Sequence, residues 1–133
     1  IAIINAMKAG ASDIYILGAT GTRMDHTFTN ICNMKAALDC DVPCFIYDKH
    51  NKIYLVNDHM GEVKLAKDGQ YGEYVSIVPL SEEAVISLSG FKYTLDNYVL
   101  HQGLSICQSN EIKEDEAFIK IKKGLLIVFE TKD

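Results

Sequence analysis

Residues 14–26 read Ile-Tyr-Ile-Leu-Gly-Ala-Thr-Gly-Thr-Arg-Met-Asp-His, and this stretch decides how the first part of the chain folds. The four apolar residues at its start predict a short buried strand. The two glycines that follow predict a loop, and a helical pattern begins near Asp25. The stretch is therefore expected to form a strand, a glycine-bearing loop and the N-terminus of a helix.

A loop of this kind suits a phosphate group, because backbone N–H groups and the positive end of the helix dipole face an anion there. Arg23 adds a planar, permanently charged guanidinium that fits phosphate oxygens. Asp25 adds a carboxylate that can hold Mg²⁺. The spacing differs from the Walker phosphate loop, which needs Gly-Lys-Ser/Thr, and from the dinucleotide fingerprint, which needs a third glycine.

Plain structural roles compete with this interpretation of the loop. Asp25 can cap the helix by accepting the amide of Phe28, and Arg23 can be an ordinary surface arginine beside a helix start. For His26 and Asn30, functional and packing roles both stay open.

Composition narrows the class of protein. The chain has 133 residues, of which 48% are hydrophobic, and its net charge of −5 argues against a nucleic-acid binder. No apolar run approaches the roughly 20 residues that cross a bilayer, so no membrane partner is expected. The four cysteines lack Cys-x-x-Cys spacing and predict reduced thiols in the cytoplasm. The sequence opens without methionine inside a helical pattern, so we expect a fragment of a longer protein.

Helix and strand alternate in a first unit, which we assign to residues 1–57. A helix tail ends at Gly10, a strand follows at 14–17, and Pro43 precedes a second strand at 44–47. Apolar residues recur at helical spacing between the two strands and predict one apolar face, made of Met24, Phe28, Ile31, Cys32 and Leu38. The order strand, helix, strand predicts a parallel α/β sheet. The polar run 48–52 that follows predicts a hairpin turn.

Short β-type runs without intervening helices make up a second unit, which we assign to residues 58–133. Together with a run at 53–56, they lie at 63–65, 74–78, 85–88, 98–100, 118–121 and 125–129. Turn residues separate them, and this spacing predicts an antiparallel β-sandwich or barrel. The predicted fold class is therefore α/β plus all-β, with the remnant of a parallel α/β domain followed by an antiparallel β-sandwich.

Four segments of the chain resemble thiamine pyrophosphokinases, in the right order. They are Gly18–His26 with the following Asn-Ile, Leu88–Leu95 with its glycine-aromatic-lysine-aromatic pattern, Ser105–Glu111 with its Ser-Asn pair, and Lys122–Leu126 in the closing hairpin. The resemblance covers nearly the whole chain. It implies an α/β catalytic, nucleotide-binding domain followed by a thiamine-binding β-sandwich.

The resemblance also implies an activity. An enzyme of this family moves the β,γ-pyrophosphoryl group of ATP onto the hydroxyl of thiamine, giving thiamine diphosphate and AMP, with Mg²⁺ as cofactor. It works as a homodimer, whose active site forms between the catalytic domain of one subunit and the sandwich of the other. The partners implied are thus thiamine, ATP and a second copy of the chain.

The same resemblance assigns roles to single residues. Arg23 would hold the ATP phosphates, and Asp25 would help to position magnesium, so both would be catalytic. The implied ATP site comprises Gly18, Thr20, Gly21, Arg23 and His26, and the implied thiamine site comprises Tyr93, Ser109 and Asn110. As an alternative, Ser109 and Asn110 are turn residues between strands.

The chain departs from the family in one respect that matters. Family members carry further magnesium-binding aspartates, in an Asp-Phe-Asp-Ser type motif and a Thr-Asp pair, and neither motif occurs between Ile1 and Asp133. We therefore expect this chain alone to be inactive. The alternative function is a non-catalytic module that binds thiamine or mediates dimerisation.

Overall fold

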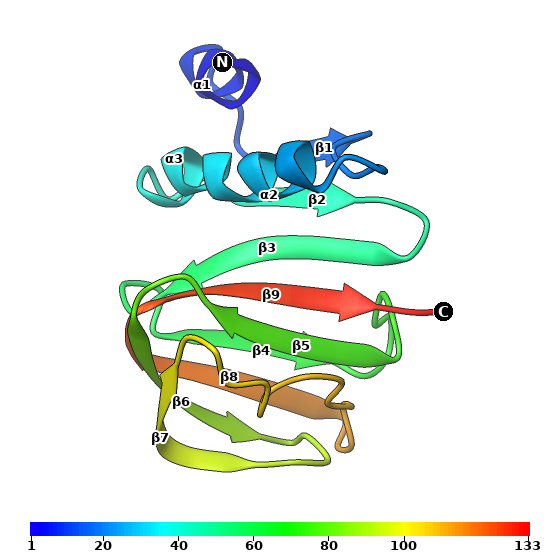
Figure 1. Ribbon diagram of the computed structural model, residues 1–133, viewed down its shortest axis with the longest axis vertical. Helices are drawn as coiled ribbons and strands as arrows, with labels where there is room; N and C mark the ends of the chain where they lie inside the picture. Colours follow the sequence, from blue (N-terminus) through cyan, green and yellow to red (C-terminus); the bar gives the residue numbers. More distant parts are fainter.

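The computed structural model describes residues 1–133, which form three α-helices and nine β-strands (Figure 1). The helices are α1 (Ala2–Lys8), α2 (Met24–Asn33) and α3 (Lys35–Leu38). The strands are β1 (Ile14–Leu17), β2 (Cys44–Tyr47), β3 (Asn51–Asn57), β4 (Glu62–Ala66), β5 (Tyr74–Pro79), β6 (Glu83–Ser89), β7 (Leu95–His101), β8 (Glu116–Lys123) and β9 (Leu125–Thr131). No helix is long and apolar enough to span a membrane.

The first unit contains the predicted strand, helix and strand. β1 and β2 are parallel, with Ile14 opposite Cys44 and Leu17 opposite Tyr47. The chain passes from β1 to β2 through α2 and α3, which lie along one side of these strands in Figure 1. A turn after β2 reverses the chain into the antiparallel strand β3. The hairpin expected around residues 48–52 is therefore confirmed.

The predicted apolar helix face is only partly buried, which corrects the expectation from periodicity. The helix divides at Met34 into α2 and α3, and the buried residues of α2 are Thr27 and Ile31. Met24 and Phe28 are 69% and 55% exposed. Helical spacing shows which side chains share a face, but not how far the neighbouring strands extend beneath that face.

Two sheets form the body of the molecule. The larger sheet has the strand order β1-β2-β3-β9-β5, and the smaller sheet has the order β4-β8-β6-β7. Apart from the β1–β2 pair, all pairings are antiparallel. The two sheets enclose a hydrophobic core that includes Val56, Ile86 and Leu126. The second unit supplies the whole smaller sheet and strands β5 and β9 of the larger one, and β3 of the first unit completes the layer over this core.

β3 joins the two parts of the fold. It pairs with β9 along all of Asn51–Asn57, and it also pairs with β2. Its four consecutive residues 53–56 are buried. Ile53 and Leu55 belong to a second core that includes Ile31 of α2, whereas Tyr54 and Val56 belong to the core between the sheets. The strand thus contributes side chains to a core on each face of the larger sheet.

One ion pair accompanies these apolar contacts on β3. The Nζ atom of Lys52 lies 3.4 Å from Oε2 of Glu130, which stands directly opposite it on β9. Glu130 is only 5% exposed. The same ammonium lies 5.3 Å and 5.5 Å from the ring centres of Phe45 and Tyr54. The buried carboxylate therefore has a cation beside it, and neighbouring aromatic rings shield that cation on part of its surface.

Candidate functional site

The loop at residues 18–22 leaves the carboxyl end of β1 and leads into α2. Gly18 has a φ angle of +72°, a conformation that residues with a side chain rarely adopt. The Nδ2 atom of Asn30 donates to the carbonyl oxygen of Ala19 at 2.9 Å, and the amide of Gly21 donates to Oγ1 of Thr27 at 3.3 Å. Two side chains of α2 thus hold the loop, and for Asn30 the packing role is the one that the structure shows.

A polar pocket of about 390 Å³ opens beside this loop. Of its nine lining residues only one is hydrophobic. It is lined by Gly18, Ala19, Thr20, Gly21, Thr22, Arg23, His26, Thr27 and Asn30. All five residues that the sequence assigns to ATP therefore surround a single pocket.

Arg23 and Asp25 lie together at the start of α2. Nη2 of Arg23 is 2.6 Å from Oδ2 of Asp25, and Nε is 3.2 Å from Oδ1. Both side chains are exposed, at 70% and 63%. The Arg23 guanidinium, and next to it the amide of His26, hold the pKa of Asp25 below its ordinary value. The two predicted residues thus form an exposed ion pair beside an open pocket.

The proposed capping bond of Asp25 is wrong in its partner. Oδ1 of Asp25 accepts the amide of His26 at 2.9 Å, not that of Phe28. Arg23 occupies the N-cap position, with φ −89° and ψ 100°, and its side chain makes no capping bond. Asp25 therefore lies inside the first turn, where its charge still favours the helix dipole.

The side chains that could hold a metal ion are few. The structure contains no group of three or more histidine, cysteine, aspartate or glutamate side chains arranged for a metal. Asp25 offers one carboxylate beside the polar pocket. One or two carboxylates together with substrate phosphates are a common set of ligands for Mg²⁺. Asp25 fits one part of such a set, and magnesium stays a prediction.

Asp48 is a residue of this region that the sequence interpretation missed. It directly follows β2, and its carboxylate accepts hydrogen bonds from four donor groups. These are Oγ1 of Thr20 at 2.6 Å, the amides of His50 and Asn51 at 2.8 Å and 2.7 Å, and Nδ2 of Asn51 at 3.0 Å. Partial burial acts to raise the pKa of Asp48, but these hydrogen bonds outweigh it, so the pKa lies below its ordinary value.

The bond to Thr20 restricts what that residue can offer a ligand. The hydroxyl of Thr20 has one proton, and that proton points to Asp48. Parallel strands end at the same edge of a sheet, so a carboxylate just after β2 lies close to the loop after β1. That rule is the signal in the sequence for Asp48, whereas the polar run that begins at Asp48 by itself indicates only a hairpin turn.

The three residues assigned to thiamine lie together elsewhere, in the connections of the sandwich. Asn110 is 5% exposed, and its Oδ1 accepts the amides of Tyr93 and Glu111, each at 3.0 Å. Its Nδ2 donates to the carbonyl oxygen of Tyr93 at 2.8 Å. The amide of Ser109 donates to Oγ of Ser76 at 2.9 Å. The side chain of Asn110 therefore fixes the backbone of Tyr93 through its amide and its carbonyl group.

Tyr93 itself presents its ring to the surface. The side chain is 61% exposed, and Nζ of Lys92 lies 5.6 Å from the ring centre. The same ammonium is 3.2 Å from Oε1 of Glu111, which raises the pKa of Lys92. An exposed aromatic ring held on a fixed backbone is a suitable surface for a flat ligand.

The two groups of predicted residues lie at opposite edges of the larger sheet. Asn110 bridges to Val75 of β5, whereas the polar pocket follows β1. β1 and β5 are the two outer strands, so about 19 Å of sheet separates them at about 4.8 Å per strand. The structure brings the residues of each group together, but it does not bring the two groups together.

Comparisons with known proteins connect these features to a family. Residues 62–126 match the family described as thiamin pyrophosphokinase, vitamin B1 binding domain. Over 129 residues, 96% of this chain, the sequence is 32% identical to thiamine pyrophosphokinase of Bacillus subtilis. The chain belongs to the thiamine pyrophosphokinase family.

Solved structures of thiamine pyrophosphokinases share the fold. The crystal structure of thiamine pyrophosphokinase from Bacillus subtilis matches 99% of this chain with a TM-score of 0.92 and 32% identity. The crystal structure from Geobacillus thermodenitrificans matches 99% of it with a TM-score of 0.87 and 31% identity. The chain covers 59% of the length of the Bacillus subtilis sequence and 61% and 60% of the two solved chains. It thus spans about three-fifths of these thiamine pyrophosphokinases.

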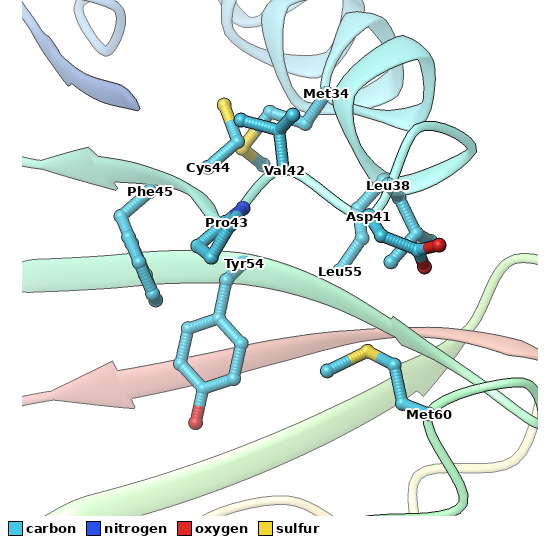
Figure 2. A pocket seen from close by; sticks show the side chains of 10 residues that line it. All are labelled: Met34, Leu38, Asp41, Val42, Pro43, Cys44, Phe45, Tyr54, Leu55 and Met60. Carbon is cyan, nitrogen blue, oxygen red and sulfur yellow. The ribbon is translucent and has the colours of Figure 1, made fainter. Parts of the chain in front are cut away.

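A separate apolar pocket lies where β2 and β3 diverge (Figure 2). It has a volume of about 160 Å³, and eight of its ten lining residues are hydrophobic. Figure 2 shows Phe45 and Tyr54 on one side of it and Met60 on another. Asp41 is its one acidic residue, and none of the residues that the thiamine pyrophosphokinase resemblance assigns to a ligand lines it.

Proposed function

We propose that the protein containing this chain transfers the β,γ-pyrophosphoryl group of ATP to the hydroxyl of thiamine, giving thiamine diphosphate and AMP. One observation carries the proposal: in a chain of this family, a permanently charged guanidinium stands exposed at a helix start beside a polar pocket. Pyrophosphoryl transfer depends mainly on positioning and on neutralising spread-out negative charge. The polar pocket offers a defined place for the phosphates, and its Arg23 offers a positive charge to neutralise them.

Three lining residues of the polar pocket and the neighbouring Asp25 have roles in this proposal. Arg23 exchanges its bond to Asp25 for phosphate oxygens, since a guanidinium can bind two oxygens of a carboxylate or of a phosphate. The backbone of Gly18 and Gly21 lines the pocket without a side chain, so phosphates can approach closely. Asp25 would supply one carboxylate ligand to a magnesium ion, and that ion would add positive charge beside the phosphates.

We further propose that the enzyme is a homodimer that acts in the cytoplasm. The polar pocket and the exposed ring of Tyr93 lie at opposite edges of one sheet, so one chain does not bring them into contact. A second copy of the chain can place its own Tyr93, Ser109 and Asn110 beside the first pocket. The four free cysteines suit a reducing compartment.

The test is an assay of ATP-dependent thiamine diphosphate formation by the native gene product and its variants. We expect Arg23→Ala to lower turnover by about 100- to 1,000-fold, as removal of one charge-stabilising group does in other enzymes. Lys35→Ala is the control, because Lys35 is an exposed, ion-paired cation on the neighbouring α3. Unchanged turnover in Arg23→Ala would show that the phosphate assignment is wrong.

A non-catalytic thiamine-binding module is the second candidate. The family match covers residues 62–126, which are described as the vitamin B1 binding domain, and it leaves the polar pocket outside. Calorimetry of the native gene product with thiamine and with an ATP analogue separates the two candidates. Binding of both ligands supports the enzyme, and binding of thiamine alone supports the module.

A further inference from the structure

A second cleft adjoins the polar pocket, between α2 and the outer face of β3 and β9. Its volume is about 480 Å³, within the range of ligand pockets, about 300–1,000 Å³. We call it the apolar cleft, after its hydrophobic lining residues Met24, Phe28, Ile31, Ile53 and Phe129. Thr20, Gly21 and Thr27 line both spaces, so a single ligand can extend from one into the other.

The apolar cleft is open on the side of α2. Ile31 and Ile53 are buried and form its floor. Met24 and Phe28 are mainly exposed, and as residues i and i+4 they stand next to each other on one helix face. A single exposed apolar side chain is ordinary, but two adjacent ones over an apolar floor form a continuous surface.

The position of this surface relative to the loop limits what can occupy it. A ligand whose phosphates enter the polar pocket can extend past Thr20 and Gly21 to Met24 and Phe28. The carboxylate of Asp48 lines the cleft, but its hydrogen bonds to Thr20, His50 and Asn51 already engage it. The surface therefore favours a flat, uncharged aromatic group rather than a cation.

We propose that the apolar cleft is the nucleoside subsite, in which the base lies against Phe28 and Met24 while the phosphates lie in the polar pocket. This inference rests on the proposed function, because it needs a nucleotide in the polar pocket. Stacking on an aromatic side chain is a common way to bind a base. The thioether of Met24 adds a polarizable contact to a ring. The cleft thus accounts for two exposed apolar residues that the core does not use.

The experiment compares two ligands on the native gene product, with affinities measured by calorimetry in the absence of thiamine. ATP carries both a nucleoside and phosphates, whereas inorganic tripolyphosphate carries only phosphates. We expect Phe28→Ala to weaken ATP binding by about tenfold, as loss of one base–aromatic stacking contact does. Tripolyphosphate binding stays unchanged. Phe28→Leu, which keeps an apolar side chain without the ring, should show most of the same loss.

Met24→Ala provides a second arm with a matched control. We expect it to weaken ATP binding several-fold without affecting tripolyphosphate. Met60→Ala is the control, since Met60 is also an exposed methionine and lines the separate pocket of Figure 2. Thermal unfolding of each variant, followed by circular dichroism, confirms that it folds; Met24 and Phe28 are exposed enough for that to be expected.

The outcomes separate this inference from the proposed function. Loss of ATP affinity alone supports the nucleoside subsite. If both ligands keep their affinity in Phe28→Ala and Met24→Ala, or if both ligands lose it equally, the subsite is overturned. Arg23→Ala tests the proposed function independently, because it should weaken both ligands. If Arg23→Ala leaves both affinities unchanged, the phosphate pocket itself is wrong.

Discussion

The carboxylate of Asp48 connects two segments that are 28 residues apart in the chain. Through Thr20 it holds the loop after β1, and through the amides of His50 and Asn51 it holds the turn after β2. The hydroxyl of Tyr71 also donates to the carbonyl oxygen of Asp48. One residue therefore fixes the shape of the turn and the position of the loop.

This role predicts a pH-dependent contribution to stability. The folded-state pKa of Asp48 lies below its unfolded value, so its stabilisation is fully present above the unfolded pKa, about 4. It is lost as the pH falls through the folded pKa. We expect Asp48→Asn to lower the free energy of unfolding by about 1–3 kcal/mol near pH 7. Urea unfolding between pH 2 and pH 7 should show this difference shrinking below about pH 4.

Asp39→Asn is the matched control for this prediction. Asp39 is an exposed carboxylate that pairs with Lys35 on α3, and exposed ion pairs contribute little to stability. A loss in Asp48→Asn that is the same at every pH would mean that the charge of the carboxylate does not stabilise the fold.

Gly90 sets how β6 passes into the following turn. Its φ angle is +76°, and a Cβ atom there would lie 2.2 Å from the carbonyl oxygen of Glu116. The carbonyl oxygen of Gly90 accepts the amides of Lys113 and Glu114 at 2.9 Å and 3.0 Å. The close approach of the two backbones therefore requires a residue without a side chain.

Two glycine substitutions separate the close approach from the backbone conformation. Gly61 has a similar φ angle, +74°, but a Cβ atom added there would have nothing within 4 Å of it. We expect Gly61→Ala to cost about 1 kcal/mol, for the conformation alone. Gly90→Ala should cost clearly more, about 3 kcal/mol or above, because backbone atoms must also shift. Equal losses in chemical denaturation would contradict the role given to Glu116.

The sequence predicts the strands well where burial alternates along them. β5 and β6 alternate buried and partly exposed residues, and both were expected at these positions. The sequence predicts α2 less well, since Met24 and Phe28 have core-like spacing but face a cleft. Periodicity reports the polarity of a face, and only the tertiary structure shows what lies opposite that face.

The cores on the two faces of the larger sheet share β3. This arrangement predicts one cooperative unfolding transition. Ile46 belongs to the core beneath the helices and Leu126 to the core between the sheets, and both are fully buried. We expect Ile46→Ala and Leu126→Ala each to lower the stability by about 2–5 kcal/mol.

Two probes of the same unfolding reaction check this prediction. Circular dichroism follows the backbone, and tyrosine fluorescence follows the seven tyrosine rings, among them Tyr54 beside Lys52. Both signals should shift together in each variant, relative to Val99→Ala, a control on a half-exposed valine of β7. Two separate transitions, each sensitive to only one substitution, would mean that the two cores fold independently.

The overall arrangement could be predicted only in part. The sequence indicates an α/β part and a β-sandwich part, but β9, the last strand, inserts between β3 and β5. Such pairing between distant segments leaves no local pattern, because alternation within a strand is the same whichever neighbour it has. The paired Arg23 and Asp25 were predicted as site residues, whereas Asp48 belongs to that region through the parallel strands β1 and β2.

The ion pair between Lys52 and Glu130 has a consequence for the alignment of β3 with β9. Both faces of β3 are apolar over four residues, so polarity alone does little to oppose slippage of β3 along β9. A slip of β3 by two residues along β9 would place Lys52 opposite Val128. The buried carboxylate of Glu130 would then have no cation beside it. An unpaired buried charge is costly, so this ion pair favours one alignment of the two strands over the others.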